Sequence, residues 1–293
     1  MKPVIFEGAG VAIVTPFTET GIDFDKLGEL IDFQIENETD AIIICGTTGE
    51  AATMPDKEHL SAIEYTVNKV AGRIPVIAGT GSNDTVHGMH LSSEAKRLGA
   101  DALLLVTPYY NKTNPKGLIA HFDAMASAGD LPVILYNVPG RTGMNIPLDV
   151  IKELNKRDYC VAIKEASGNI SYVAEIAASC PDLTIYSGND DMIVPVMSLG
   201  GKGVISVLSN IMPKETHDIC ALYAQGQVKE SAALQLRLLE VINSLFCEVN
   251  PIPVKTALNL MGMNVGKLRM PLCDMADKNL NRLKAALKDV GLI

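Results

Sequence analysis

A lysine stands inside an apolar, strand-like stretch of this sequence, and its position indicates covalent chemistry. The stretch runs over residues 160–166, and residues 160, 162 and 164 would share one face of a strand. Lysine is rarely fully buried without a purpose, and an apolar setting favours the neutral amine. The neutral amine attacks a ketone to form a Schiff base, so Lys164 is a candidate nucleophile. The strand alone leaves open that Lys164 ends it and extends to solvent.

Hydroxyl groups stand at the ends of other apolar runs. Tyr136 ends the preceding run, and a phenol can pass a proton when other hydroxyls support it. Thr47, in Gly-Thr-Thr-Gly-Glu, and Tyr110, in Tyr-Tyr-Asn, could complete such a chain. An ordinary turn whose threonine caps a helix, and a tyrosine ring in the core, remain the structural alternatives.

Further positions at run ends could bind a small acid. Arg141 lies in Pro-Gly-Arg-Thr-Gly, and its planar guanidinium suits a carboxylate, although a surface arginine is the alternative. Thr48 and Gly188 also follow apolar runs, and Ile205 on the last run would line a pocket. We expect no metal site, because all five histidines fall in helical stretches and none pairs with carboxylates at a strand end.

These residues require elements that bring many run ends together. Short, β-branched, nearly continuous apolar runs alternate with stretches of helical periodicity, as in parallel sheets buried on both faces. The expected strands are 11–17, 41–45, 76–80, 102–107, 133–137, 161–165, 184–187 and 204–207. The expected helices between them are 25–38, 56–70, 84–98, 115–127, 147–155, 170–178 and 193–199.

Eight such units predict an α/β fold, the (β/α)8 TIM barrel, in which the active site lies where the strands end. A doubly wound open sheet is the alternative, but no glycine-rich phosphate motif follows the first run. After residue 212 only helices are expected, over 213–224, 228–246, 253–261 and 274–290. We therefore expect a catalytic barrel over residues 1–226 and a helical extension over 227–293 that packs against it.

Composition limits the environment and the partners. The chain of 293 residues has a formal net charge of −9, which argues against nucleic acid and anionic membranes as partners. No apolar run is long enough to span a membrane, and the first residues do not resemble a signal peptide. Six cysteines without metal-type spacing are typical of reduced thiols, so a cytoplasmic protein is expected.

The motifs resemble those of the dihydrodipicolinate synthase family, from about residue 4 to the C-terminus. They are Gly46–Glu50, Tyr109–Asn111, Tyr136–Gly143, Ile163–Ala166 and Gly203–Ser206. The resemblance implies a lyase that joins pyruvate, as a Schiff base on Lys164, to L-aspartate 4-semialdehyde. The step belongs to the diaminopimelate route of lysine biosynthesis and needs no cofactor.

The same resemblance implies a role for each site residue. Tyr136 would donate and accept the proton, with Thr47 and with Tyr110 reaching in from a neighbouring subunit of a homotetramer, a dimer of dimers. Thr48 and Ile205 would hold pyruvate. Arg141 would hold the carboxylate of the semialdehyde.

Other functions share this first half-reaction. N-acetylneuraminate lyases and 2-keto-3-deoxy-acid aldolases use the same lysine and tyrosine with a different second substrate. The arginine loop and the Thr-Thr pair favour the synthase. A barrel that binds a keto acid without catalysis is a remote alternative, which loss of Lys164 or Tyr136 would indicate.

The resemblance also implies a regulatory pocket for lysine, with one departure. The pocket would comprise Ala52, Asp56, His59, Asn83, His87 and Tyr109. Inhibited bacterial members usually have histidine where Asp56 stands and glutamate where His87 stands. Because a histidine cannot supply that negative charge to an ammonium group, we expect weak or absent inhibition by lysine.

Overall fold

The computed structural model describes residues 2–293 and contains a closed barrel of eight parallel strands in sequence order. The predicted (β/α)8 fold is confirmed. The strands are β1 Gly8–Ala12, β2 Ala41–Ile44, β3 Val76–Gly79, β4 Ala102–Val106, β5 Val133–Asn137, β6 Cys160–Glu165, β7 Thr184–Ser187 and β8 Gly203–Ser206.

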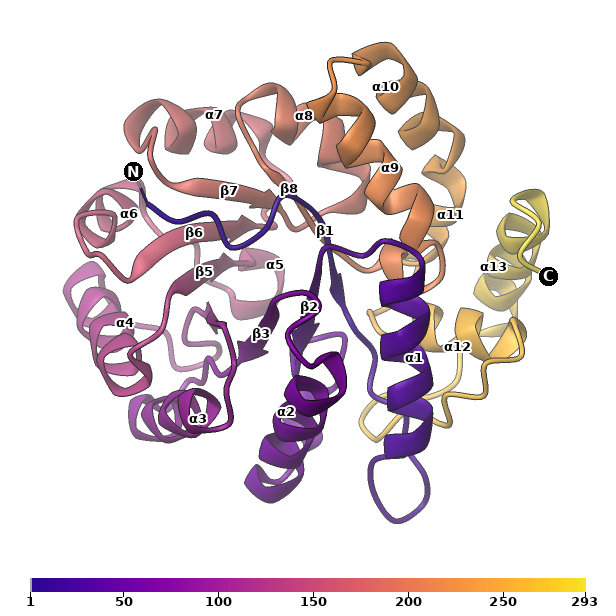
Figure 1. The fold of residues 1–293 in the computed structure, drawn as a ribbon, viewed down its shortest axis with the longest axis horizontal. Coiled ribbons are helices and arrows are strands. Elements are labelled where there is room, and N and C mark those ends of the chain that lie inside the picture. Colours follow the sequence, from indigo (N-terminus) through magenta and orange to yellow (C-terminus); the bar gives the residue numbers. More distant parts are fainter. Residues whose placement is uncertain (1) are drawn as a thin grey trace.

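Helices alternate with the strands and surround them (Figure 1). They are α1 Phe24–Glu36, α2 Asp56–Val70, α3 Thr85–Arg97, α4 Pro115–Gly129, α5 Pro139–Thr142, α6 Leu148–Leu154, α7 Ile170–Ser179, α8 Ile193–Ser198 and α9 Pro213–Ala224. Short 3₁₀ turns are η1 Ala51–Thr53, η2 Asp190–Met192 and η3 Leu208–Asn210. None of the helices in residues 2–293 is long and apolar enough to cross a membrane.

The C-terminal helices lie on the side of the barrel where α9 and α1 are found (Figure 1). They are α10 Val228–Arg237, α11 Leu239–Ser244, α12 Ile252–Leu260 and α13 Asp277–Asp289. Helix α10 packs against α8 and α9, and α13 packs against α11 and α12. The single helix predicted over 228–246 is wrong, because the backbone of Leu238 (φ −89°, ψ 0°) ends α10 and α11 begins after it.

The strands are buried on both faces, so they separate two apolar clusters. The outer cluster lies between the sheet and the helices, and the inner cluster fills the barrel. At the strand starts, the rings of Phe6 and Tyr186 stack with centroids 4.3 Å apart, and the Tyr186 hydroxyl donates to the Phe6 carbonyl at 2.7 Å. This contact, called the plug below, fills the barrel interior next to the start of β1, and this end is called the closed end below.

Two strand predictions need correction. The first strand is Gly8–Ala12 rather than 11–17, because the backbone N–H groups of Val14 and Phe17 are donated to Asn210 Oδ1 and to the Val265 carbonyl. In β6 the pairing with β5 shifts between Val133 and Ile134. Cys160 consequently packs in the outer cluster and Ala162 in the inner one, so residues 160, 162 and 164 do not share a face.

Candidate active site

Lys164 lies near the carboxyl end of β6 and is 6% exposed. It is paired in register with Tyr136 on β5 and Tyr186 on β7. Its Nζ lies 4.5 Å from the centroid of the Tyr136 ring. No residue within 2–293 forms an ion pair with Lys164, in contrast to Lys255, the other buried lysine, which is paired with Glu50. A buried lysine ammonium left without a carboxylate is costly, so its position requires a functional reason.

Tyr136 is the nearest aromatic neighbour of that amine. Its ring is 7% exposed and belongs to the inner cluster, at the same level of the barrel as Lys164. The two predicted residues are therefore brought together by adjacent strands. A phenol beside an amine can exchange a proton with an adduct formed there.

The turn after β2 carries Thr47 and Thr48. Two consecutive backbone hydrogen bonds shape it, from Gly49 N to the Gly46 carbonyl and from Glu50 N to the Thr47 carbonyl, each 3.1 Å. Thr48 is buried, and its Oγ1 accepts a hydrogen bond from Asn250 Nδ2 at 2.9 Å. Thr47 is half-buried.

Arg141 lies in the one-turn helix α5, where the sequence suggested a loop. Its side chain is exposed, and Nη2 donates to the backbone carbonyl of Asn250 at 3.0 Å. Asn250 thus connects Arg141 with Thr48, and its Oδ1 is buried without a partner among the described residues. The guanidinium forms no ion pair in residues 2–293 and retains donors for an anion.

The end of β7 approaches β6 closely, and the segment after β7 is hydrogen-bonded to the end of β8. A Cβ on Gly188 would lie 2.5 Å from the Cβ of Ala166, so only glycine fits where Gly188 N donates to the Glu165 carbonyl at 2.7 Å. Asp190 is buried, and its Oδ2 accepts from Val207 N and Leu208 N, each at 3.0 Å. Burial raises the pKa of the Asp190 carboxyl, and the positive charge of Lys164 is among the influences that lower it. Ile205 is fully buried in the inner cluster.

A second buried carboxyl supports the loop that carries Arg141. Glu165 Oε2 accepts from Asn137 Nδ2 at 2.7 Å, and Asn137 Oδ1 accepts from Ile146 N at 2.9 Å. Burial raises the pKa of Glu165, and the hydrogen bonds from Ser167 and Asn137 oppose that shift. These contacts fix both ends of the segment between β5 and α6.

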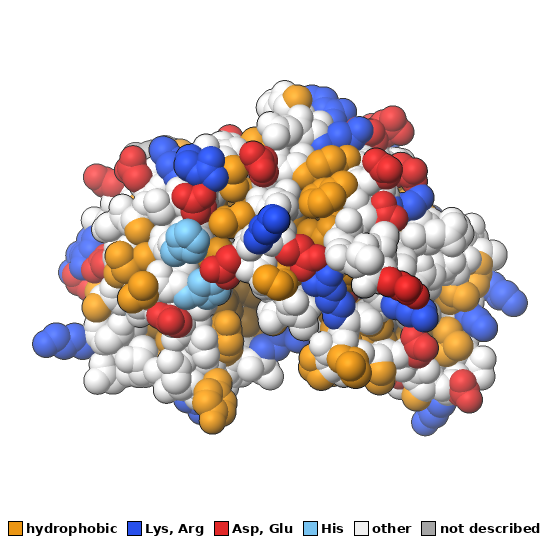
Figure 2. Space-filling model, turned by 90° about the horizontal axis from the view of Figure 1, so that it is seen from below, with side chains coloured by type: hydrophobic (Ala, Val, Ile, Leu, Met, Phe, Trp, Pro, Cys, Tyr) orange, Lys and Arg blue, Asp and Glu red, His pale blue; other side chains and the backbone are white. Residues whose placement is uncertain are grey.

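Tyr110 does not join the other candidates within this chain. It is 91% exposed, with a positive φ of 70°. Tyr109, Val86 and Met89 are also exposed, and together with Tyr110 they are called the α3 patch below. Figure 2, seen from the side where α2 and α3 lie, shows apolar side chains gathered among charged ones on this face.

Some of the residues assigned to a regulatory pocket are in contact. Asp56 Oδ1 and His87 Nε2 lie 2.8 Å apart. His59 is buried, its Nε2 is 2.9 Å from the Gly79 carbonyl, and burial lowers the pKa of its imidazole. The Asn83 carbonyl accepts from Asn111 Nδ2 at 2.8 Å, next to Tyr109. Ala52 is exposed in η1.

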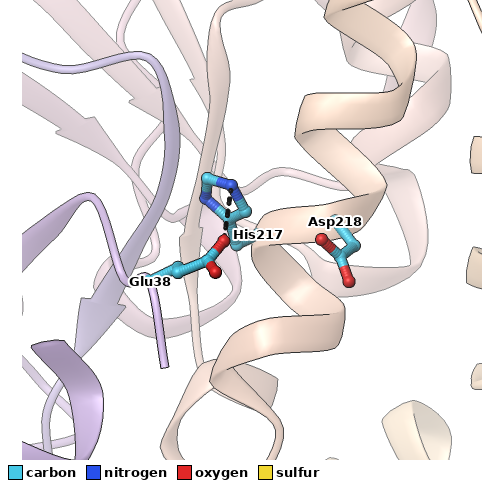
Figure 3. A group of neighbouring side chains, drawn as sticks. All are labelled: Glu38, His217 and Asp218. Carbon is cyan, nitrogen blue, oxygen red and sulfur yellow. Dashed lines mark ion pairs between the residues drawn. The ribbon is translucent and has the colours of Figure 1, made fainter. Parts of the chain in front are cut away.

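One group of possible metal ligands lies at the opposite end of the barrel. Within residues 2–293 it consists of Glu38 from the loop after α1 with His217 and Asp218 from α9 (Figure 3). Lys214 Nζ lies 2.9 Å from Glu38 Oε2 and 2.6 Å from Asp218 Oδ1. Because the Lys214 ammonium already forms ion pairs with both carboxylates, this group is best described as an ion-pair network.

Sequence reasoning missed Asn250, Lys255 and the pairs that they form. Lys255 stands within the apolar stretch of α12, and a lysine among buried positions at helical spacing was the available signal. Glu50 was noticed only as part of its motif, and Asp190 was not singled out.

Comparison with known proteins identifies the relatives of this chain. The model of the dihydrodipicolinate synthetase family matches residues 5–290. The 4-hydroxy-tetrahydrodipicolinate synthase of Acetivibrio thermocellus is 61% identical over 294 aligned positions, covering 100% of both chains. A dihydrodipicolinate synthase variant characterised as monomeric has a TM-score of 0.96 at 39% identity, covering 99% of this chain and 98% of that one. The enzyme of Cyanidioschyzon merolae, solved with lysine bound, has a TM-score of 0.95 at 39% identity, covering 99% of each.

Proposed function

This chain belongs to the dihydrodipicolinate synthetase family, and from that premise we propose that it condenses pyruvate, held as a Schiff base on Lys164, with L-aspartate 4-semialdehyde. It is a lyase, a 4-hydroxy-tetrahydrodipicolinate synthase in the diaminopimelate route to lysine. The observation that carries the Schiff-base assignment is the unpaired, 6% exposed amine of Lys164 beside Tyr136.

The first step joins the amine to the ketone. The neutral Lys164 amine attacks the pyruvate carbonyl, and loss of water leaves an imine. Tyr136, whose ring lies beside Lys164 Nζ, delivers the proton that the departing hydroxyl requires. Loss of a proton from the pyruvate methyl group then gives the enamine, whose carbon attacks the aldehyde.

The other residues bind the two carboxylates. Thr48, held by Asn250, and the backbone at Ile205 bind the pyruvate carboxylate, and Gly188 lets the turn after β7 lie close to Ala166 at the end of β6. Arg141 binds the carboxylate of the semialdehyde. Thr47 and Tyr110 extend the hydroxyl relay from Tyr136. The barrel over 1–226 carries this chemistry and the extension over 227–293 braces it. No cofactor, nucleic acid or membrane takes part, and the enzyme works in the cytoplasm.

Trapping the adduct tests the mechanism. The protein is incubated with pyruvate, reduced with borohydride, and digested for mass spectrometry. A reduced pyruvate adduct on Lys164 is expected, followed by turnover when the semialdehyde is supplied. A folded protein that acquires no adduct would contradict the mechanism. An adduct with turnover of a sugar acid, and none of the semialdehyde, would favour a related aldolase.

We also propose that Tyr110 acts in the site of a neighbouring subunit within a homotetramer. Tyr110 is almost fully exposed in the isolated chain and lies in the apolar α3 patch, which supports this assignment. Mixing inactive Tyr110→Phe and Lys164→Arg subunits should restore activity, because one site in each mixed pair then has both groups. If Tyr110 acted within its own chain, the mixture would remain inactive.

Regulation by lysine is proposed to be weak or absent. Asp56 and His87 are partners of each other, so the carboxylate is not free for an ammonium group, and burial disfavours a charged His59. Titration with lysine should therefore leave the rate nearly unchanged. Clear inhibition at sub-millimolar lysine would refute this proposal.

A further inference from the structure

The Gly46–Glu50 motif contains one ionisable residue, Glu50, that the chemistry above leaves unused. Glu50 follows the catalytic turn, is 4% exposed, and adopts a left-handed backbone conformation with φ 56°. A non-glycine residue in that conformation is maintained only when its surroundings hold it there. The side chain of Glu50 identifies those surroundings.

Both carboxylate oxygens of Glu50 are bonded to the C-terminal part of the chain. Oε1 lies 2.8 Å from Lys255 Nζ on α12, and Oε2 accepts from Arg269 N at 2.9 Å. The Lys255 ammonium also donates to the carbonyls of Thr15 at 3.0 Å and Lys267 at 2.9 Å. The pair is therefore fully satisfied, and its two side chains are 1% and 0% exposed.

An aromatic ring completes this enclosure. Lys255 Nζ lies 4.7 Å and the Arg269 guanidinium carbon 3.8 Å from the centroid of the Phe17 ring. Two cations on one ring repel each other, and the Glu50 carboxylate compensates for that repulsion. Burial lowers the pKa of Lys255, and the charge of Glu50 opposes that shift.

Burying such a pair is not an efficient way to stabilise a fold. Desolvation of two charges commonly cancels their attraction, and apolar replacements are often no less stable. The pair does, however, fix geometry, because each oxygen and each N–H has one partner. The same C-terminal segment supplies Asn250, which donates to Thr48 Oγ1 within the same turn.

We propose that Glu50 and Lys255 are positioning residues that lock the Thr47–Thr48 turn to the C-terminal extension and so hold both hydroxyls in their reacting geometry. The extension is thereby part of the active-site structure. This inference rests on the proposed roles of Thr47 and Thr48. Displacing a reacting group by about 1 Å can reduce a rate about 100-fold.

The test compares two double variants. Glu50→Gln with Lys255→Met removes both buried charges together and leaves neither unpaired. Glu240→Gln with Arg282→Met removes the exposed ion pair between α11 and α13, in the same extension but away from the turn. For each protein, kcat and both KM values are measured. The kcat is expressed per subunit that traps pyruvate on borohydride reduction. Hydrogen exchange is measured for the amides of residues 46–50.

The buried-pair variant should lose about 10- to 100-fold in kcat, and its amides at 46–50 should exchange faster, whereas the control should match the parent protein. Thr47→Val should cost less in the buried-pair variant than in the parent, because the hydroxyl is already misplaced. Parental kcat and exchange, or an undiminished cost of Thr47→Val, would overturn the proposal.

The exchange measurement separates this proposal from the proposed function. Failure of the parent protein to trap pyruvate would refute the Schiff-base mechanism, whereas unchanged exchange at 46–50 would refute the positioning role regardless of activity. If the double variant does not fold, Phe17→Leu takes its place, since it loosens the enclosure and keeps the ion pair. A smaller loss of the same kind is expected, and parental behaviour would overturn the proposal.

Discussion

Basic side chains at the two ends of the barrel differ in the partners that they have within the chain. At the strand starts, Lys2 Nζ donates to Asn155 Oδ1 at 2.8 Å and to the carbonyls of residues 155, 157 and 160. There too, His217 Nδ1 lies 2.9 Å from Asp40 Oδ2. At the strand ends, Lys164 and Arg141 form no ion pair within residues 2–293. Lys2 and His217 thus have partners within the chain, whereas the two basic side chains proposed to meet substrate have no carboxylate partner, although Glu50 and Lys255 near them are paired.

This difference explains how one fold separates stability from chemistry. At the closed end, the hydrogen bonds of Lys2 and His217 connect the N-terminal segment and α9 to the strand starts, and these groups need no ligand as a partner. The unpaired cations at the open end suit two anionic substrates, although the net charge of the whole chain is −9. Substitutions at the two ends should therefore have different consequences.

The largest contrast is expected between two lysines at opposite ends. Lys164→Arg retains the charge but cannot form an imine, so activity should fall by roughly 10³-fold or more with little change in melting temperature. Lys2→Met should lower the melting temperature and leave kcat unchanged, because it removes only hydrogen bonds at the strand starts, to Asn155 Oδ1 and to backbone carbonyls. Steady-state kinetics and thermal unfolding of both variants check this. Appreciable turnover by Lys164→Arg would contradict the prediction that Lys164 is required for activity.

A smaller loss is expected at Tyr136. Tyr136→Phe keeps the ring beside Lys164 and removes the hydroxyl proposed to pass the proton, so kcat should fall roughly 10²- to 10³-fold. Tyr186→Phe is the matched control, because that hydroxyl bonds the Phe6 carbonyl in the plug and should affect stability alone. Equal effects of the two variants on kcat would contradict the prediction that only the Tyr136 hydroxyl contributes to the reaction.

The location of Lys164 and Tyr136 near the ends of adjacent strands was predictable because strand ends and residue types are local features of the sequence. Glu50 and Lys255 are 205 residues apart, and His217 and Asp40 are 177 apart, so no local pattern predicts either pair. The face assigned to Cys160 was wrong for the same reason. The shift in register depends on how β5 pairs with β6, which the sequence of one strand does not reveal. The division at Leu238 likewise interrupts a stretch whose periodicity alone reads as one helix.

At Arg141 the expected effect concerns binding of one substrate. Arg141→Lys retains a cation but loses the planar, two-point donor, and a charged hydrogen bond contributes about 1.5–3 kcal/mol. The KM for aspartate semialdehyde should therefore rise roughly 10-fold or more, while pyruvate trapping on Lys164 stays normal. Arg157, whose guanidinium is already paired with Asp123 and Glu153, provides the matched Arg→Lys control. A rise in the KM for pyruvate alone would contradict the assignment.

The smallest effect is expected at His217, and it should depend on pH. The hydrogen bond to Asp40 raises the pKa of His217, with a further contribution from the charge of Glu38, while burial and Lys214 oppose the shift. A raised pKa means that the charged form stabilises the fold fully below the unfolded value of about 6.5, and that this stability is lost as pH rises through the folded value.

His217→Gln keeps a donor for Asp40 but removes the charge, so it should cost about 1 kcal/mol or less near pH 6. The cost should shrink towards pH 9, as the parent imidazole also loses its charge. Chemical unfolding of both proteins at the two pH values measures it, with kcat as the control that should not change. The pH dependence of this loss in unfolding free energy distinguishes an electrostatic contribution of His217 from a packing contribution. A loss of packing alone would lower the unfolding free energy equally at both pH values.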